Sequence, residues 1–287
     1  MHPLSNIIFS TFSILLLSSI SNAKDSILDY ENIFYKNRDY ISQGFGIHVD
    51  IGYSSYLIEL DSSELNSAID YDVLEFTLGF SYQYDRWIYG LYSKFLINEL
   101  NSNMCVTTTK KSLNDIAYID KSEFALYLNR KLIEFQNSSW SINFIYRYSS
   151  LDSIDSYHSF HNYRSQFDYQ TDGLALSLVY NQTISEKGSW FINGGVLYTL
   201  ARVKCLEYIN NSVQDSFVDD SSHAIGERLS IGYNYQLSDK LFINIRVDGW
   251  RLNFNKLSVS SHIGDSLPKA ELKERSVSSY GGITWRF

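Results

Sequence analysis

The last ten residues, SSYGGITWRF (Ser278–Phe287), alternate bulky apolar side chains with small or polar ones. Ile283, Trp285 and Phe287 share one face of an extended chain, and Arg286 lies on the opposite face. This period of two is typical of a β-strand that separates an apolar from a polar environment. A terminal strand must also pair its backbone groups, and closure of a barrel pairs them on both edges. The stretch therefore predicts the closing strand of a β-barrel.

The same alternation recurs along the chain and predicts an all-β protein of about ten strands, within a range of roughly eight to twelve. Nine earlier segments with one apolar face begin near Phe45, Leu74, Trp87, Phe124, Trp140, Leu174, Trp190, Leu229 and Leu241. The sequence is 16% aromatic, yet no segment after the N-terminal region is long and apolar enough to suit a membrane-spanning helix. This combination favours a transmembrane antiparallel up-and-down β-barrel.

The predicted connections alternate between tight turns and long polar loops. The tight turns lie at Tyr84–Arg86, Gln136–Ser139, Ser185–Ser189 and Leu237–Lys240, and the long loops at 60–71, 100–119, 150–170, 204–223 and 257–272. Short periplasmic turns and long outer loops are typical of outer-membrane barrels. Trp87, Trp140 and Trp190 each follow a tight turn, and with Trp285 they predict an aromatic girdle at the inner interface. A water-soluble β-sandwich would give no reason for this placement.

The N-terminal run Asn6–Ala23 is apolar and ends in small residues, which predicts a cleaved signal peptide. It is too short and too rich in serine for a spanning helix. We therefore divide the chain into a signal peptide (1–23), a periplasmic lead-in (24–44) and a transmembrane barrel (45–287).

The final segment, YGGITWRF (Tyr280–Phe287), resembles the C-terminal signature of Gram-negative outer-membrane proteins, with Trp285 and Phe287 as the matching aromatics. In those proteins the barrel-assembly machinery reads this signature. The resemblance implies a protein of the Gram-negative outer membrane with extracellular loops, in contact with outer-membrane lipid and lipopolysaccharide. Arg130 falls on the lipid-facing side of its strand, near the inner end, where its charge can snorkel to the interface.

Charged and polar side chains of both signs fall on the inward parity of the strands. They are His48, Asp50, Glu75, Lys94, Glu123, Arg147, Arg228, Arg246 and Asp248. A barrel of this strand number has a lumen that side chains nearly fill, which favours a packed polar core over an open pore. We therefore expect a non-enzymatic surface protein with a structural, adhesive or other interaction role that includes an extracellular ligand. A narrow porin-like channel for ions or small solutes is the alternative.

In outline the chain also resembles the omptin proteases, which have a similar length, about ten strands and long outer loops. That resemblance implies acidic residues on one side of an extracellular cleft and an Asp/His pair on the other. The candidates in the second and fourth long loops are Asp115, Asp120, Asp219, Asp220 and His223. A carboxylate beside a histidine can orient it as a general base. The spacings differ from the omptin pattern, and solvated surface positions are the simpler interpretation of these residues.

Other classes of function find little support. The formal net charge of −8 argues against a nucleic-acid binder, which would need a basic face. No phosphate-binding glycine loop and no metal-ligand spacing occurs, so we expect no cofactor and no metal site.

Two further expectations concern the outer end. The two cysteines, Cys105 and Cys205, both fall in predicted outer loops, and the oxidising periplasm favours a disulfide between them, with free thiols as the alternative. Arg202, Lys204 and Arg251 fall just beyond the outer ends of their strands. Cations at that level are candidates for contact with lipopolysaccharide phosphates, to which Arg offers two parallel hydrogen bonds.

Overall fold

The computed structural model describes residues 43–62, 65–108, 112–115, 117–155, 163–209, 212–258 and 269–287. The predicted signal peptide and nearly all of the predicted lead-in lie outside these residues. The described part forms one sheet of eleven strands: β1 (Gln43–Asp61), β2 (Leu65–Tyr84), β3 (Trp87–Thr108), β4 (Ser112–Asp115), β5 (Ala117–Glu134), β6 (Ser138–Asp155), β7 (Tyr163–Thr183), β8 (Gly188–Ile209), β9 (Ser212–Gln236), β10 (Leu241–Phe254) and β11 (Glu271–Arg286). None of the described residues forms a helix of the length and apolarity needed to span a membrane.

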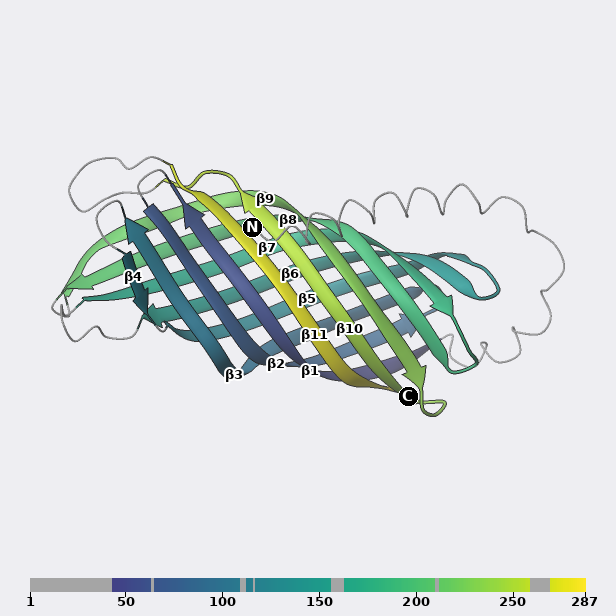
Figure 1. Ribbon diagram of the computed structural model, residues 1–287. Coiled ribbons are helices and arrows are strands. Elements are labelled where there is room, and N and C mark those ends of the chain that lie inside the picture. The colour runs from purple at the N-terminus through teal and green to yellow at the C-terminus, as the bar shows by residue number, and fades with distance from the viewer. Residues whose placement is uncertain are drawn as a thin grey trace. The chain divides into compact units, whose positions relative to one another are not determined.

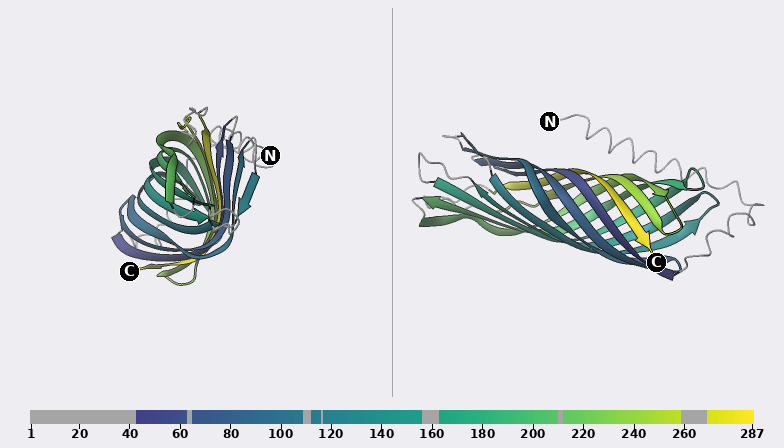
Figure 2. Two further views of the ribbon diagram at one scale, coloured as in Figure 1. Left: turned by 90° about the vertical axis from the view of Figure 1, so that its left-hand side faces the viewer. Right: turned by 90° about the horizontal axis from the view of Figure 1, so that it is seen from below.

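Ten of these strands close into an antiparallel barrel in which chain neighbours are sheet neighbours (Figure 1). β1 pairs with both β2 and β11, which completes the ring, and the short β4 pairs only with the outer part of β3. Seen from one end, the strands wrap around a common axis (Figure 2). The backbone of the last residue is held as well, because Phe287 and Phe45 exchange two backbone hydrogen bonds of 2.9 Å. The predicted all-β, ten-stranded antiparallel barrel is confirmed.

The tight turns all lie at one end of the barrel, which we call the short-turn end. Tryptophans follow three of these turns on the outward face, and Tyr180 links two of them, with ring centroids 4.8 Å from Trp140 and 5.6 Å from Trp190. Arg130 also faces outward at this end, with its guanidinium 4.9 Å from the centre of the Trp87 ring. Tryptophan and arginine side chains are both favoured at the interface between an apolar layer and water.

From the short-turn end to about mid-length, the outward face of the strands is mainly apolar, with Arg130 as a charged exception near the turns. On β10, for example, Ile245 is 59% exposed and Val247 45% exposed. Farther along the same outward face of β10, the side chains become Arg251 and Asn253. An apolar band of about ten residues per strand matches what a tilted strand needs to cross a bilayer. We call this region the apolar band.

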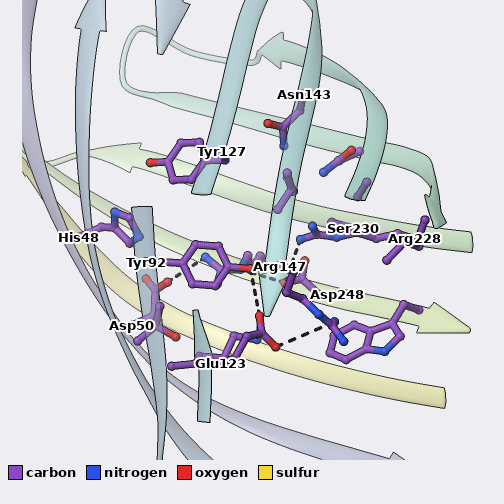
Figure 3. A pocket seen from close by; sticks show the side chains of 18 of the residues that line it. His48, Asp50, Tyr92, Glu123, Tyr127, Asn143, Arg147, Arg228, Ser230 and Asp248 are labelled. Atoms are coloured by element: carbon purple, nitrogen blue, oxygen red, sulfur yellow. Dashed lines mark hydrogen bonds and ion pairs between the residues drawn. The ribbon is translucent and has the colours of Figure 1, made fainter. Parts of the chain in front are cut away.

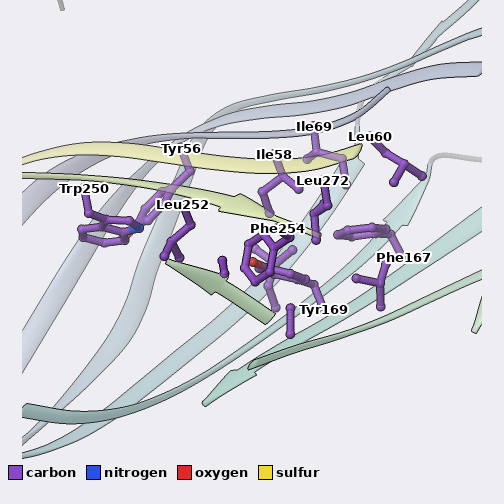
Figure 4. Packing of buried hydrophobic residues seen from close by; sticks show 14 of the residues in the cluster. Tyr56, Ile58, Leu60, Ile69, Phe167, Tyr169, Trp250, Leu252, Phe254 and Leu272 are labelled. Atoms are coloured by element: carbon purple, nitrogen blue, oxygen red, sulfur yellow. The ribbon is translucent and has the colours of Figure 1, made fainter. Parts of the chain in front are cut away.

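Beyond the apolar band, the polarity of the two faces is inverted. The halves of the strands away from the short-turn end, which we call the outer half, point apolar side chains inward, where they form the buried core in Figure 4. On β1, Tyr56, Ile58 and Leu60 are at most 4% exposed inside the barrel, whereas Glu59 faces outward. The outer half is therefore built like a water-soluble barrel that extends past the band.

This core explains a difference from the sequence-based expectation. Much of what alternation alone assigns to long loops is paired strand, since β8 and β9 run together from Gly188↔Tyr235 to Ile209↔Ser212. Inward apolar side chains give these segments a core to pack on, so the ladders continue well beyond the apolar band.

Candidate functional site

A layer of buried and half-buried ionic side chains crosses the lumen near the middle of the barrel. It contains five acids and five bases, all inward-facing: Asp50, Glu75, Glu123, Asp248 and Glu274, with Lys94, Lys121, Arg147, Arg228 and Arg246. We call these ten residues the ion network. Equal numbers of acids and bases make its formal charge zero. Buried charges are tolerated in proteins when they are paired and hydrogen-bonded in this way.

Glu75 is the most completely bonded member of the ion network. Its carboxylate accepts hydrogen bonds from the hydroxyls of Ser54 (2.6 Å), Tyr56 (2.8 Å) and Tyr280 (2.9 Å). Lys121 adds an ion pair at 3.1 Å, and the Glu75 side chain is only 3% exposed. Since strands β1, β2, β5 and β11 all contribute, this carboxylate ties together a wide arc of the wall.

A second node lies around Glu274, whose two oxygens accept hydrogen bonds from Tyr169 (2.6 Å) and from the indole N–H of Trp250 (3.1 Å). Arg147 lies between this carboxylate and Glu123, with N···O distances of 3.7 and 3.9 Å. Its guanidinium also lies 4.6 Å from the centre of the Trp250 ring. The lumen at this level is therefore bridged by side chains from β5, β6, β7, β10 and β11.

The third node is nearer the short-turn end. Arg246 pairs with Asp50 at 2.8 Å and with Asp248 at 3.1 Å, and Arg228 lies 3.9 Å from Asp248. Next to this node is a cavity of about 320 Å³, in which Figure 3 shows Asp50, Asp248 and Arg228 among the lining side chains. His48 lines the same cavity.

All nine polar residues that the sequence places in the lumen lie on its wall. The structure adds Lys121 and Glu274, which sequence reasoning missed because they border ranges assigned to loops. A signal was present in the strand parity. Lys121 has the same parity as Glu123, and Glu274 has the same parity as Arg286, which the sequence places opposite the apolar face of the final strand.

At the outer end, Asp220 and His223 attach the segment that follows β10 to β9. The Asp220 carboxylate accepts backbone N–H groups of Ser258 (2.7 Å) and Ser221 (2.8 Å). These hydrogen bonds stabilise the charged form and lower the pKa of Asp220. His223 faces outward, with its Nε2 atom 2.8 Å from the side-chain amide of Asn255.

The remaining protease candidates are dispersed. Asp120 is exposed on the outward face of β5, opposite Asp152 of β6. β5 and β9 are separated in the sheet by β6, β7 and β8, so Asp120 and His223 are not neighbours. Asp115 belongs to β4 and Asp219 to β9, and their side chains lie outside the described part of the structure. The candidates whose side chains the structure describes, Asp120, Asp220 and His223, provide no assembled catalytic pair on which to base a hydrolytic mechanism.

The Asp220 contacts predict a pH-dependent attachment of the segment at Ser258. Because the folded-state pKa is lowered, the stabilisation is present above the unfolded-state value of about 4 and is lost as pH falls through the folded-state pKa. Hydrogen exchange at Ser258, corrected for intrinsic rate, should therefore stay constant from about pH 7 to 5 and rise only as the pH falls through the lowered folded-state pKa of Asp220. Asp220→Asn should raise it about fivefold at pH 7, since a charged acceptor becomes neutral. Asp239→Asn, in an exposed short turn, is the control; an equal rise there would contradict the assignment.

The other outer-end candidates are placed as follows. Arg202 and Lys204 are exposed on the outward face of β8, and Arg251 is partly exposed on that of β10, each just past the apolar band. Cys105 lies on β3 and Cys205 on β8, two strands that are not adjacent in the sheet. The cysteine side chains lie outside what the structure describes, and their disulfide stays a prediction.

Comparison with known proteins identifies a fold. No protein-family model and no curated protein matches the sequence. Among solved structures, the outer membrane protease OmpT from Escherichia coli aligns with a TM-score of 0.68 at 9% sequence identity, covering 85% of this chain and 97% of OmpT. The fold is that of a Gram-negative outer-membrane β-barrel. Other outer-membrane barrels also match, with lower scores.

Two of these matches are the translocator domain of the autotransporter NalP from Neisseria meningitidis and the outer membrane protein OprG from Pseudomonas aeruginosa. The first has a TM-score of 0.44 at 11% identity, over 99% of this chain and 98% of the domain. The second has a TM-score of 0.41 at 13% identity, covering 85% of this chain and 96% of OprG. At 9% identity the likeness to OmpT shows the fold alone, so function must be argued from the side chains of this chain.

Proposed function

We propose that this outer-membrane barrel is a non-enzymatic surface protein. Its lumen does not conduct ions or solutes, and its outer half is presented to an extracellular ligand. This proposal rests on the observation that side chains fill the lumen at two successive levels. The ion network bridges it near mid-length, and the apolar core occupies it beyond that level. A solute on this route would have to break paired buried charges and then displace well-packed apolar side chains, and both steps are costly.

The architecture of the outer half supports a role in recognition. A protruding barrel with its own core holds the strand ends in fixed positions, and binding surfaces on rigid scaffolds lose less conformational entropy on association. Its outward face carries charged side chains such as Asp70, Asp168 and Arg202 rather than an apolar surface. We place this half outside the cell and the short-turn end in the periplasm.

The closed lumen makes a direct prediction for planar bilayers. The refolded barrel should show no steady open level, only rare brief events, because the ion network and the apolar core both occupy the described lumen. Single-channel recording measures this, with a porin of known conductance reconstituted under the same conditions as the positive control. A large, steady conductance would overturn the proposal in favour of the porin-like alternative.

The recognition role is tested on cells. A deletion strain should bind fewer host cells or a smaller set of serum proteins than the parent, and plasmid-borne protein should restore binding. Equal binding by the deletion strain would leave the barrel a structural protein only.

We further propose that Arg202 and Arg251 contact lipopolysaccharide phosphates. Both side chains face outward just past the apolar band, Arg202 exposed and Arg251 partly exposed. The double variant Arg202→Ala/Arg251→Ala should lower lipopolysaccharide affinity about tenfold, since two charge-assisted contacts are lost. Binding can be measured by native mass spectrometry, with Lys187→Ala at the short-turn end as the control. Unchanged binding in the double variant would show that these arginines are ordinary interfacial charges.

A further inference from the structure

The cavity of about 320 Å³ lies between the ion network and the short-turn end, and we call it the chamber. Asn244 and Thr284 line it only three residues or fewer from the short-turn ends of β10 and β11. The ion network and the apolar core lie on its other side. The short-turn end is thus the nearest opening of the barrel.

The chamber gathers polar atoms that have no hydrogen-bond partner among the described residues. Of the twelve buried side-chain atoms without a hydrogen bond in the described part of the chain, nine belong to residues that line it. They include carboxylate oxygens of Asp50, Glu123 and Asp248 and amide oxygens of Asn143, Asn193 and Asn244. A buried polar atom without a hydrogen bond destabilises the fold. We therefore expect the chamber to contain molecules that form hydrogen bonds with these atoms.

The charges of the wall argue for a neutral occupant. Each lining acid already faces a base: Asp50 and Asp248 pair with Arg246, and Glu123 pairs with Lys94 at 3.5 Å. An added cation would meet the four bases of the wall, and an added anion would meet its three acids. Molecules with hydroxyl groups instead donate to the free carboxylate and amide oxygens and accept from the free Nε of Arg228.

The remaining surface of the chamber is aromatic. Tyr92, Tyr127, Phe191 and Trp250 contribute to its wall, and such rings provide flat apolar faces beside the polar groups. The volume is at the small end of the range for ligand pockets, which suits a molecule of a single ring.

We propose that the chamber is a binding site for a neutral polyhydroxylated molecule of about one sugar ring, which enters from the short-turn end. The site is separate from the outer recognition surface, and its failure would leave the closed-lumen function unaffected.

The test uses D-glucose as the probe and the full barrel in a zwitterionic, sugar-free detergent. Saturation-transfer NMR and calorimetry should detect saturable binding with a dissociation constant of about 1 to 10 mM, the range that so small a ligand reaches. Asn193→Leu and Asn244→Leu should each weaken binding about tenfold, because an apolar side chain of similar volume replaces a polar one facing the chamber. Circular dichroism would establish that both variants are folded.

The matched control is Asn98→Leu, an exposed position on β3 outside the chamber, which should bind glucose unchanged. Glucose 6-phosphate and glucosamine should bind at least about tenfold more weakly than glucose, since each brings an unbalanced charge. The proposal is overturned by the absence of saturable glucose binding up to about 100 mM, which would leave a chamber filled by water alone. Equal weakening by Asn98→Leu, or equal binding of the charged analogues, would overturn it too.

Discussion

Glu75→Gln should lower the free energy of unfolding by about 3 to 5 kcal/mol, because it leaves buried positive charge without its partner. Lys121 lies 3.1 Å from Glu75, and its side chain is only 6% exposed, so it cannot turn to water. The Gln amide keeps one carbonyl oxygen and places an NH₂ group where the other carboxylate oxygen stood. It can therefore accept a hydrogen bond from Ser54 or from Tyr56 but not from both, and the loss combines the charge with a hydrogen bond. Denaturant unfolding in detergent or lipid measures the effect.

Two further variants test whether the loss of stability comes from the unpaired buried charge. Glu75→Gln/Lys121→Met removes both members of the pair and should recover half or more of the lost stability, since a neutral pair of similar volume leaves no orphan charge. Glu134→Gln breaks the exposed pair with Lys131, whose side chain is 37% exposed, and should cost at most about 1 kcal/mol. If Glu75→Gln lowered the free energy of unfolding as little as Glu134→Gln does, the ion network would not stabilise the barrel.

Ile245→Lys should cost about 2 to 4 kcal/mol, because it places a charge in the middle of the lipid-facing apolar band. Asn253→Lys lies on the same strand and the same outward face, eight positions farther on, and should change stability by less than about 0.5 kcal/mol. Both variants are compared by unfolding of the barrel in lipid bilayers. Similar costs at the two positions would contradict our placement of the membrane boundary near Arg251.

Much of the apolar band could be predicted from the sequence, since a strand that faces lipid on one side and a polar lumen on the other must alternate. Ile243, Ile245 and Val247 show this on β10, and Ile283, Trp285 and Phe287 show it at the C-terminus. The same alternation placed Lys94, Glu123 and Arg147 on the inner face. Tight turns followed by tryptophan indicated which ends of the strands lie together.

The outer half was predicted poorly because its alternation continues on the opposite parity. On β1 the bulky residues run through odd positions to Tyr53 and through even positions from Tyr56, with Ser54 and Ser55 between. On β7 the change lies between Tyr169, which faces inward, and Leu174, which faces outward. Read locally, such a break is the end of a strand and the start of a loop.

The sequence by itself therefore determined a lipid-facing β-barrel, its approximate strand number and most of the inward charges, because one-sided burial in lipid leaves a period of two that survives without knowledge of neighbours. The tertiary structure alone decided that the strands continue past the band with their polarity inverted, and which acid meets which base. Those outcomes depend on side chains from strands far apart in sequence: Glu75 meets Tyr280, and Tyr169 meets Glu274, across separations of 205 and 105 residues. A local pattern specifies the face on which a side chain lies, whereas its partner is set by the closure of the ring.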